Sequence, residues 1–424
     1  MKLVSLTAAL HLAAAAAAAQ VSYAGFRAVR VPVGEDVAPL AEIIAQLRLP
    51  TWKGAADGVP RPNTNVDLVV PADQVAEFER LTAAMDTEVM HEDLGAAMAA
   101  EVSVHNSVYN SKIWTWFDAY RSYSDHLVFL EDLVKQFKNT ELITAGDSAE
   151  GRPITGIRIW GSAGKGEKPA VVLHSGAHAR EWTTISATEF IAEFLLSGHD
   201  WIPEMEELVN KYEYYIFPIV NPDGFVYSQT TDRLWSKNRQ TKPSSSCVGR
   251  DISRNWPYEY AWLGDGSSSN PCSETYRAQG AAPGDAPETK GLLDFIEHIS
   301  NMQKIQLFID FQSYSQAIMT PYSHSCTAVA PNDATLQSLA SNMSSTIKQF
   351  ADTDFAFGTV CQTIGVVNGA STDYVKEVVD AEHVFTFELS DKGNNGFLQP
   401  VDQILPLAFE AWAGVRHLLM QMAD

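Results

Sequence analysis

The sequence has few basic residues. Only 30 Lys and Arg stand against 52 Asp and Glu, which gives the 424 residues a formal charge of −22. Recognition of nucleic-acid phosphates depends on clustered cations, so this composition argues against a nucleic-acid partner. Long apolar runs are also missing beyond the N-terminus, so we expect no membrane span. The 46% of hydrophobic residues is still enough to fill a large globular core.

The first 19 residues have the organisation of a secretory signal peptide. Lys2 precedes a short apolar stretch and an alanine run, which offers Ala17 to Ala19 as a small-residue cleavage site before Gln20. An ordinary alanine-rich helix gives no reason for this order of features. We therefore expect a secreted, extracellular and soluble mature protein, in which cysteines can oxidise.

Cysteine is scarce, with four residues in the whole chain. Four cysteines allow three pairings, and counting alone does not choose among them. Cys247 and Cys272 both lie in Ser-rich segments. We favour a bond between these two, and a second bond between Cys326 and Cys361.

The N-terminal region has a short, repetitive pattern. Between Tyr23 and about Leu94, strand-like segments of alternating apolar residues take turns with helix-like segments. This pattern predicts a small β-α-β-α-β unit of antiparallel type. A polar stretch from Glu101 to Lys112 then separates this unit from the rest of the chain.

The longer second region opens with a predicted amphipathic helix that has Leu127, Leu130, Val134 and Phe137 on its apolar face. Near-continuous apolar runs then alternate with helical patterns. Strands that are buried on both faces produce such runs, so the sequence predicts an α/β fold with a sheet covered by helices on both sides. The runs are AVVL, YEYYIFPIV, IQLFIDF and HVFTFEL, and the helical segments include TISATEFIAEFLL and QILPLAFEAWAGVRHLL.

One short motif carries metal-binding chemistry. His178 and Glu181, in the order His-Ala-Arg-Glu, follow directly from the run AVVL and a Ser-Gly turn. A strand that ends in a turn can direct an imidazole and a carboxylate to one point. With a distant third ligand, such a pair would leave a zinc ion one position for water.

Several longer motifs resemble those of a known family. GAHAREW, FPIVNPDGF, RLWSKNRQ, SRNW, SSSNPCSETYRA, SYSQ and FTFELSDKG, in this order, resemble the secreted metallocarboxypeptidases of the carboxypeptidase A and B type, especially their fungal members. The resemblance covers essentially the whole chain. It implies a mixed β-sheet covered by helices on both faces, after a small α+β prosegment domain. The expected limits are 1–19 for the signal peptide, 20–108 for the prosegment and 109–424 for the metallocarboxypeptidase domain.

The resemblance also implies a zymogen and its site residues. The prosegment would cover the cleft of a monomeric zinc exopeptidase that acts on peptides or proteins with free C-termini. His178 and Glu181 match two ligands of one Zn²⁺ ion, and Arg180 matches an arginine of the substrate cleft. Arg254 matches the arginine that binds the terminal carboxylate, for which a planar guanidinium is suited. Glu388 matches the general base that activates the zinc-bound water.

Four positions depart from the family pattern in this same cleft. Gln312 stands where the third zinc ligand, a histidine, is expected. Ser236 replaces the arginine that stabilises the oxyanion, and Ser253 replaces an asparagine that helps to bind the terminal carboxylate. Gly365 stands where a tyrosine normally covers the substrate.

These departures predict weak metal binding and slow turnover. Glutamine offers a neutral amide oxygen in place of an imidazole nitrogen, so zinc affinity should fall by orders of magnitude. The loss of one oxyanion-stabilising group typically costs ~10²–10³ in turnover. Asp310, two residues before Gln312, is expected to support the site without binding metal, and His174 and His324 are expected to be loop or core histidines.

The expected specificity pocket carries no fixed charge. Thr372 matches the position that is acidic in family members that prefer basic residues, and Val367, Ile364 and Thr386 would be its neutral walls. A preference for apolar or aromatic C-terminal residues is implied.

Three hypotheses remain open from the sequence. The first is a secreted member of the family that has lost most catalysis. The second is an active zinc carboxypeptidase with A-like specificity, which tolerates glutamine as a ligand and retains Glu388. The third is a module that binds peptides or inhibitors in the cleft without turnover. Four altered positions in one cleft favour the first.

Overall fold

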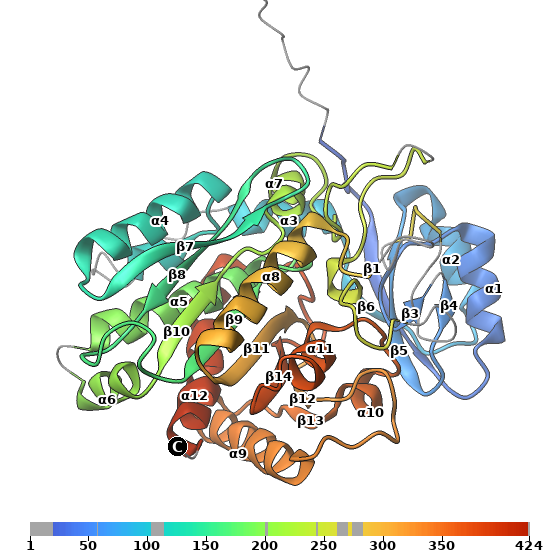
Figure 1. Ribbon diagram of the computed structural model, residues 1–424. Coiled ribbons are helices and arrows are strands. Elements are labelled where there is room, and N and C mark those ends of the chain that lie inside the picture. The colour runs from blue at the N-terminus through green and yellow to red at the C-terminus, as the bar shows by residue number, and fades with distance from the viewer. Residues whose placement is uncertain are drawn as a thin grey trace, which may run out of the picture.

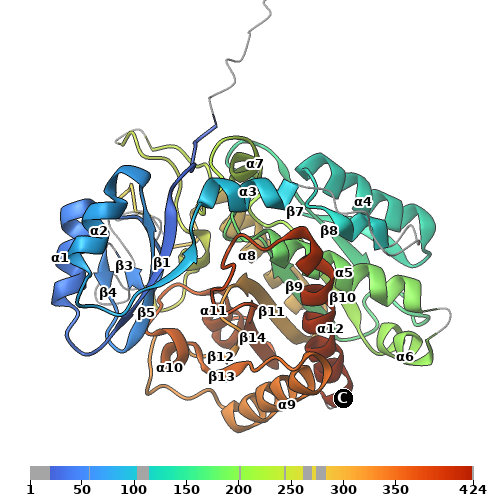
Figure 2. The same ribbon diagram turned by 180° about the vertical axis from the view of Figure 1, so that it is seen from behind.

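A computed structural model describes residues 20–56, 58–102, 114–199, 202–242, 245–260, 270–273 and 283–422. The expected signal peptide, and residues 103–112 of the expected connector, lie outside the described residues. The chain forms a small N-terminal unit beside a larger one that is built around an extended sheet (Figures 1 and 2). Within the described residues, no helix is both long enough and apolar enough to cross a membrane.

The small unit has the α+β fold predicted for the prosegment, and it is called the prosegment below. Its main sheet has the strand order β2-β5-β1-β6, and every neighbouring pair is antiparallel. Alternating valines of β1 and β5 pack on the helices in one small core. The predicted order of strands and helices is confirmed, and the short strands β2 to β4 are additions. The elements are β1 (Arg27–Val33), α1 (Ala38–Leu47), β2 (Thr51–Lys53), β3 (Ala55–Ala56), β4 (Val59–Pro60), β5 (Thr64–Val70), a 3-10 turn (Ala72–Gln74), α2 (Val75–Leu81), β6 (Glu88–His91) and α3 (Leu94–Val102).

The larger unit contains an eight-stranded mixed sheet in the order β13-β12-β14-β11-β9-β10-β8-β7. The four central strands β14, β11, β9 and β10 are parallel to one another. The elements are β7 (Thr140–Asp147), β8 (Pro153–Ile159), β9 (Ala170–Ser175), β10 (Glu213–Phe217), β11 (Ile305–Ser313), β12 (Ala317–Thr320), β13 (Ala356–Thr359) and β14 (His383–Leu389), with helices α4 (Tyr123–Gln136), α5 (Trp182–Gly198), α6 (Pro203–Lys211), α7 (Pro222–Thr230), α8 (Pro287–Met302), α9 (Asp333–Ala351), α10 (Val360–Ile364), α11 (Ser371–Glu377) and α12 (Ile404–Gln421), and 3-10 turns at Trp114–Asp118, Ile252–Arg254 and Val401–Gln403.

Helices cover both faces of this sheet, as the apolar runs predict (Figures 1 and 2). One apolar cluster joins the sheet to α4, α5, α6, α9 and α12, and a second joins the opposite face to α8 and α11. Every residue of β9, β10 and β14 is buried. Burial of one large apolar side chain contributes about 1.5–3 kcal/mol, so these two clusters supply the main stabilisation of the unit.

The buried face of α4 is rotated slightly from the predicted one. Leu127, Val134 and Phe137 are only partly buried, because the helix turns its neighbouring positions toward the sheet. The imidazole of His126 is fully inside and makes a 2.7 Å contact with the carboxylate of Glu189. The buried residues of the helix are His126, Phe129, Leu130 and Leu133.

Both favoured disulfides are present. Cys247 is bonded to Cys272, and Cys326 is bonded to Cys361. Cys272 lines the cleft between the two units, so the Cys247–Cys272 disulfide restrains part of the cleft wall. The loops closed by these bonds separate their cysteines by 25 and 35 residues, and closing loops of this length is worth ~3 kcal/mol each in the chain-entropy model.

The prosegment lies on the C-terminal edge of the central strands. An apolar cluster joins Trp52 and Leu94 of the prosegment to Tyr314 and Phe397 of the larger unit. All four side chains are buried. The small unit is therefore attached to the larger one through a buried apolar cluster. It covers the C-terminal edge of the central strands, where the site residues lie.

Candidate active site

His178 and Glu181 come from the turn between β9 and α5. Gly176 has a φ of +67° in this turn, and a Cβ there would lie 3.1 Å from the carbonyl oxygen of Pro218, so the turn requires glycine. Glu181 is the last residue before α5 begins at Trp182. The Nδ1 atom of His178 lies 2.9 Å from Oε1 of Glu181. The sequence therefore correctly places an imidazole and a carboxylate together at a strand end.

The other side of the His178 ring is held by a residue that the sequence analysis missed. Its Nε2 atom lies 3.3 Å from Oδ1 of Asp251 and 3.0 Å from Oγ of Ser253. Although burial favours the neutral ring, Glu181 and Asp251 raise the pKa of His178 well above its ordinary value. The position of Asp251, two and three residues before the two motif residues Ser253 and Arg254, could have identified it.

Glu181 is also fixed by the neighbouring strand. Its Oε2 atom accepts a 3.0 Å hydrogen bond from the backbone N–H of Ser313, at the end of β11. The residue is only 4% exposed. Both oxygens of Glu181 therefore have partners from within the larger unit.

Gln312 lies on β11 directly opposite Glu388 of β14, since the two residues are register partners in the parallel pair. The Nε2 atom of Gln312 donates a 3.2 Å hydrogen bond to Oδ2 of Asp310. Asp310 also accepts from Ser371 Oγ at 2.7 Å and contacts His174 at 3.1 Å. Asp310 thus contacts the side chain at the expected ligand position, as its spacing on the strand suggests.

These donors do not fit a catalytic zinc site with three protein ligands. His178 and Glu181 supply one imidazole and one carboxylate, and the third expected position has an amide. Among the residues that the structure describes, no group of three His, Cys, Asp or Glu side chains is placed to hold a metal ion. Zinc sites of this type use nitrogen, sulfur or carboxylate ligands, so the set is one strong donor short.

Two arginines of the larger unit line the cleft and have different surroundings. Arg254 donates from Nε to Oδ2 of Asp251 at 3.1 Å, while its buried Nη1 has no hydrogen-bond partner within the described part of the chain. Arg180 donates to the carbonyl of Trp52 at 3.2 Å, and its guanidinium lies 4.1 Å from the ring centre of Phe397. Arg254 therefore has an N–H group that could donate to another group.

Ser236 lines the same cleft, but the proposed specificity residues do so only in part. The backbone carbonyl of Ser236 accepts a hydrogen bond from the N–H of Ala179 at 2.9 Å, which anchors its loop beside His178. Ile364 lines the cleft, whereas Thr372, Val367 and Thr386 are buried and do not line it. Thr372 is 1% exposed, and its hydroxyl has no partner among the described residues.

The two remaining histidines agree with their expected structural roles. His174 is buried at the end of β9 and packs edge-on against Phe308 at 4.9 Å between ring centres. His324 lies in a loop and contacts Asp373 at 2.8 Å. Neither histidine lines the cleft.

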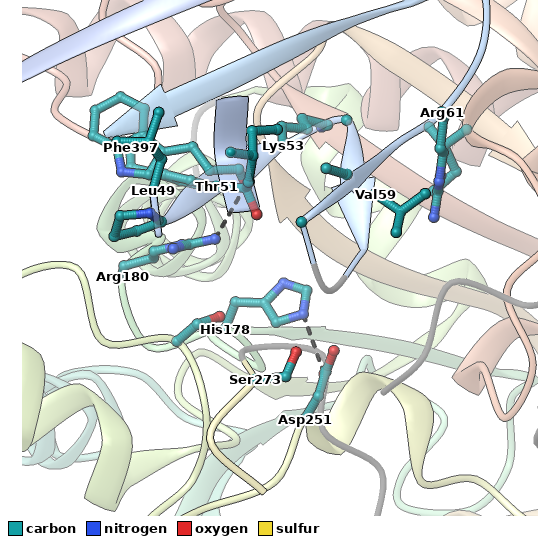
Figure 3. A pocket seen from close by; sticks show the side chains of 18 of the residues that line it. Leu49, Thr51, Lys53, Val59, Arg61, His178, Arg180, Asp251, Ser273 and Phe397 are labelled. Atoms are coloured by element: carbon teal, nitrogen blue, oxygen red, sulfur yellow. Dashed lines mark hydrogen bonds and ion pairs between the residues drawn. The ribbon is translucent and has the colours of Figure 1, made fainter. Parts of the chain in front are cut away.

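The prosegment lines the cleft with several cations, including Lys53 and Arg61. Figure 3 shows Lys53 and Arg61 on the prosegment side of a cavity of about 1160 Å³, across from His178 and Asp251. The ammonium of Lys53 forms an ion pair with the carboxylate of Glu388. Arg61 lies near Gly365, and a Cβ at Gly365 would be 3.3 Å from its Nη1. Burial and repulsion from Arg254 lower the pKa of Arg61 to about 10. No local feature of the sequence marks these two residues.

Comparison with known proteins finds family matches along most of the chain. Residues 126–414 match the zinc carboxypeptidase family, and residues 30–101 match the carboxypeptidase activation peptide. A probable metallocarboxypeptidase A of Trichophyton verrucosum is 43% identical over 97% of this chain and 96% of its own length. A metallocarboxypeptidase A-like protein of the same organism is 42% identical over 95% and 94%. The crystal structure of thrombin-activatable fibrinolysis inhibitor is 25% identical, covers 94% of this chain and 98% of its own, and has a TM-score of 0.85.

Proposed function

Because the chain belongs to the zinc carboxypeptidase family and carries its activation peptide, we propose that it is a secreted member of the family in which zinc binding and peptide hydrolysis are impaired. The observation behind this proposal is the donor set. Within the described residues, no third His, Cys, Asp or Glu is placed to hold a metal ion together with His178 and Glu181, and Gln312 uses its amide nitrogen to bond Asp310.

The neighbouring departures from the family pattern also predict slower peptide hydrolysis. Ser236 is too short to replace an arginine at a developing oxyanion, and such donors are typically worth ~10²–10³ in turnover. Glu388 remains as a general base, but without a firmly bound metal there is little to activate its water. We therefore expect the protein to have lost both firm metal binding and stabilisation of the negative charge that forms during the reaction.

Recognition of the substrate's terminal carboxylate is weakened but not abolished in this proposal. Arg254 keeps a buried N–H group without a partner among the described residues, which supports a role in binding an anionic group. Ser253 instead directs its hydroxyl to Asp251 at 2.6 Å. With Gly365 in place of a tyrosine, one side of the bound terminus stays open.

We further propose a preference for apolar or aromatic C-terminal residues. Ile364 supplies a neutral wall to the cleft, and Thr372 adds no charge beneath it. A lysine or arginine side chain entering this pocket would meet no fixed acidic partner at the Thr372 position.

Two other functions have some support. The buried position of Glu388 beside Gln312 favours an active enzyme that uses an amide ligand. The contacts that Trp52 and Lys53 make in the cleft favour a module that binds peptide segments without cleavage. The substitution at Ser236 argues against the first of these.

We propose that the mature protein results from cleavage after residues 20–108, within the polar connector. Lys112 is the only Lys or Arg from Glu101 to Lys112. Trypsin should therefore cut first after Lys112 and leave a stable fragment that begins at Ile113. A first cut well inside the larger unit would exclude this boundary.

Hydrolysis of a peptide ending in Phe by the trypsin-treated protein tests the proposed function. Turnover should be low or undetectable in the unmodified chain. Gln312→His should restore part of it, and adding Ser236→Arg should give the larger gain, since it supplies the missing oxyanion donor. Glu388→Gln in this double variant is the control and should abolish the gain. Brisk turnover without any substitution would support the active-enzyme alternative instead.

A further inference from the structure

Lys53 enters the cleft from the end of a prosegment strand. It is the last residue of β2, which pairs with β5 through Thr51 and Leu68. Gly54 follows with a φ of +82°, and a Cβ there would lie 1.9 Å from the carbonyl oxygen of Asn65, so this turn requires glycine. The direction of the Lys53 side chain is thus set by the strand before it and the turn after it.

The ammonium of Lys53 is surrounded by three acceptor surfaces of the larger unit. It donates to Oε2 of Glu388 and to the backbone carbonyl of Tyr314. It also lies 5.1 Å from the centre of the Tyr314 ring, within the range of a cation–π contact. Ser315 donates its hydroxyl to the same oxygen of Glu388 and holds that carboxylate in place.

The acceptor surfaces are fixed by buried contacts. Tyr314 is 1% exposed, and in the zymogen its hydroxyl also donates to Oδ2 of Asp67 of the prosegment at 2.5 Å. Its ring packs edge-on against Phe397 at 4.8 Å. Glu388 is 4% exposed. A buried carboxylate is costly without a cationic partner, so this arrangement favours a bound cation.

The two arginines that the larger unit contributes to the cleft are directed to other groups, while Arg61 of the prosegment is attracted to Glu388. Arg254 donates to Asp251, and Arg180 donates to backbone carbonyls, including that of Trp52. The ion pair of Glu388 is formed with Lys53. The ammonium of Lys53 contacts one carboxylate oxygen, one carbonyl oxygen and one ring face. This set of contacts suits the compact charge of an ammonium group better than a guanidinium, which is wide and planar.

We propose that Glu388, the Tyr314 carbonyl and the Tyr314 ring form a subsite for a primary ammonium group, the side chain of a lysine in an extended peptide. Lys53 fills this subsite within the zymogen, and a lysine of another chain fills it once the prosegment has left. The Arg180 bond to the carbonyl of Trp52 adds a main-chain anchor one residue before the lysine. This inference rests on the proposed function, because it assigns Glu388 to a bound cation in place of zinc-linked catalysis.

Chemical rescue in the full chain tests the subsite. Lys53→Ala removes a propylammonium fragment and should lower the thermal unfolding midpoint. Added n-propylammonium should raise that midpoint saturably, by about 2 °C or more at matched ionic strength, because a ligand that binds only the folded state stabilises it. The unmodified chain should show no saturable rise, since Lys53 already fills the subsite.

Three controls decide the outcome. 1-Propanol and propionate should not rescue Lys53→Ala, and n-propylammonium should not rescue the double variant Lys53→Ala with Glu388→Gln. Equal rescue by 1-propanol, rescue without Glu388, or no rescue at all would overturn the proposal. All measurements are made with a metal chelator and without substrate. A separate finding of brisk hydrolysis would therefore refute the proposed function without affecting the interpretation of the rescue experiment.

A double-mutant cycle replaces the rescue if Lys53→Ala does not fold. Lys53→Met keeps the apolar stem and removes the charge. The double variant should lose much less stability than the sum of the losses in Lys53→Met and Glu388→Gln, because each single variant already removes the same ion pair. Additive losses would contradict the subsite.

Discussion

The guanidinium of Arg233 forms a two-pronged ion pair with the carboxylate of Glu101, with both N···O distances at 2.7 Å. Both side chains are buried, although 132 positions separate them in the sequence. Arg233 also lies 3.6 Å from the ring centre of Trp182. This pair joins the last helix of the prosegment, α3, to the loop that carries Ser236, so it connects prosegment docking to the cleft.

Glu101→Ala should loosen the prosegment strongly. It leaves the Arg233 charge buried without its partner, which typically costs about 3–5 kcal/mol. Amide hydrogen exchange in β1 and β5, read by mass spectrometry, should become much faster. Glu77→Ala is the control, because it breaks the exposed Glu77–Arg80 pair of the same unit and should not change exchange measurably. Similar exchange in both variants would show that the buried pair is not needed for docking.

Gly365→Ala should also weaken prosegment docking. Gly365 has a φ of +90°, where an L-residue is strained by about 1–3 kcal/mol, and the new Cβ would approach Arg61. The matched control is Gly34→Ala, since a Cβ at Gly34 meets nothing within 4 Å. Thermal unfolding should show a lower midpoint for the first variant only. An unchanged midpoint for Gly365→Ala would mean that the loop relaxes away from Arg61.

Glu193 should make stability fall as the pH rises. The residue lies on α5 and is 6% exposed, and burial raises its pKa from 4.5 to about 7. Between these two values the unfolded chain has released this proton while the folded chain still binds it, so the folded state loses stability with increasing pH. Glu193→Gln should match the unmodified chain at pH 4 and exceed it at pH 8, by at most about 3 kcal/mol. Urea unfolding at both pH values measures this, and an equal effect at both would exclude titration of Glu193.

Much of the fold could be predicted from local pattern. Strands β9, β11 and β14 are buried on both faces, and this constraint leaves apolar runs that are visible without any tertiary information. The apolar residues of α4 alone predict a buried face that is slightly rotated from the observed one. The reason is that His126 is buried but polar, so it does not count toward an apolar stripe. A histidine can be buried there only because Glu189, from another helix, pairs with it.

The site could be predicted only in part, for a related reason. His178, Glu181, Gln312 and Glu388 stand in motifs at strand ends, so their meeting at one sheet edge follows from the order of the motifs. Lys53 reaches Glu388 from 335 positions away, and the turn at Gly54 that directs it has no chemical signature. Contacts between the prosegment and the cleft depend on how two units pack, which no short stretch of sequence specifies.

Zinc content of the purified full chain tests the central claim most directly. The chain is loaded with Zn²⁺, dialysed against a mild chelator, and measured by elemental mass spectrometry. Well below one equivalent should remain, because no group of three His, Cys, Asp or Glu side chains among the described residues is placed to hold a metal ion. Gln312→His should raise the content to about one equivalent by supplying a third strong ligand. Gln136→His, which adds an imidazole at the exposed end of α4, should leave it unchanged. One tightly held equivalent in the unmodified chain would contradict the account.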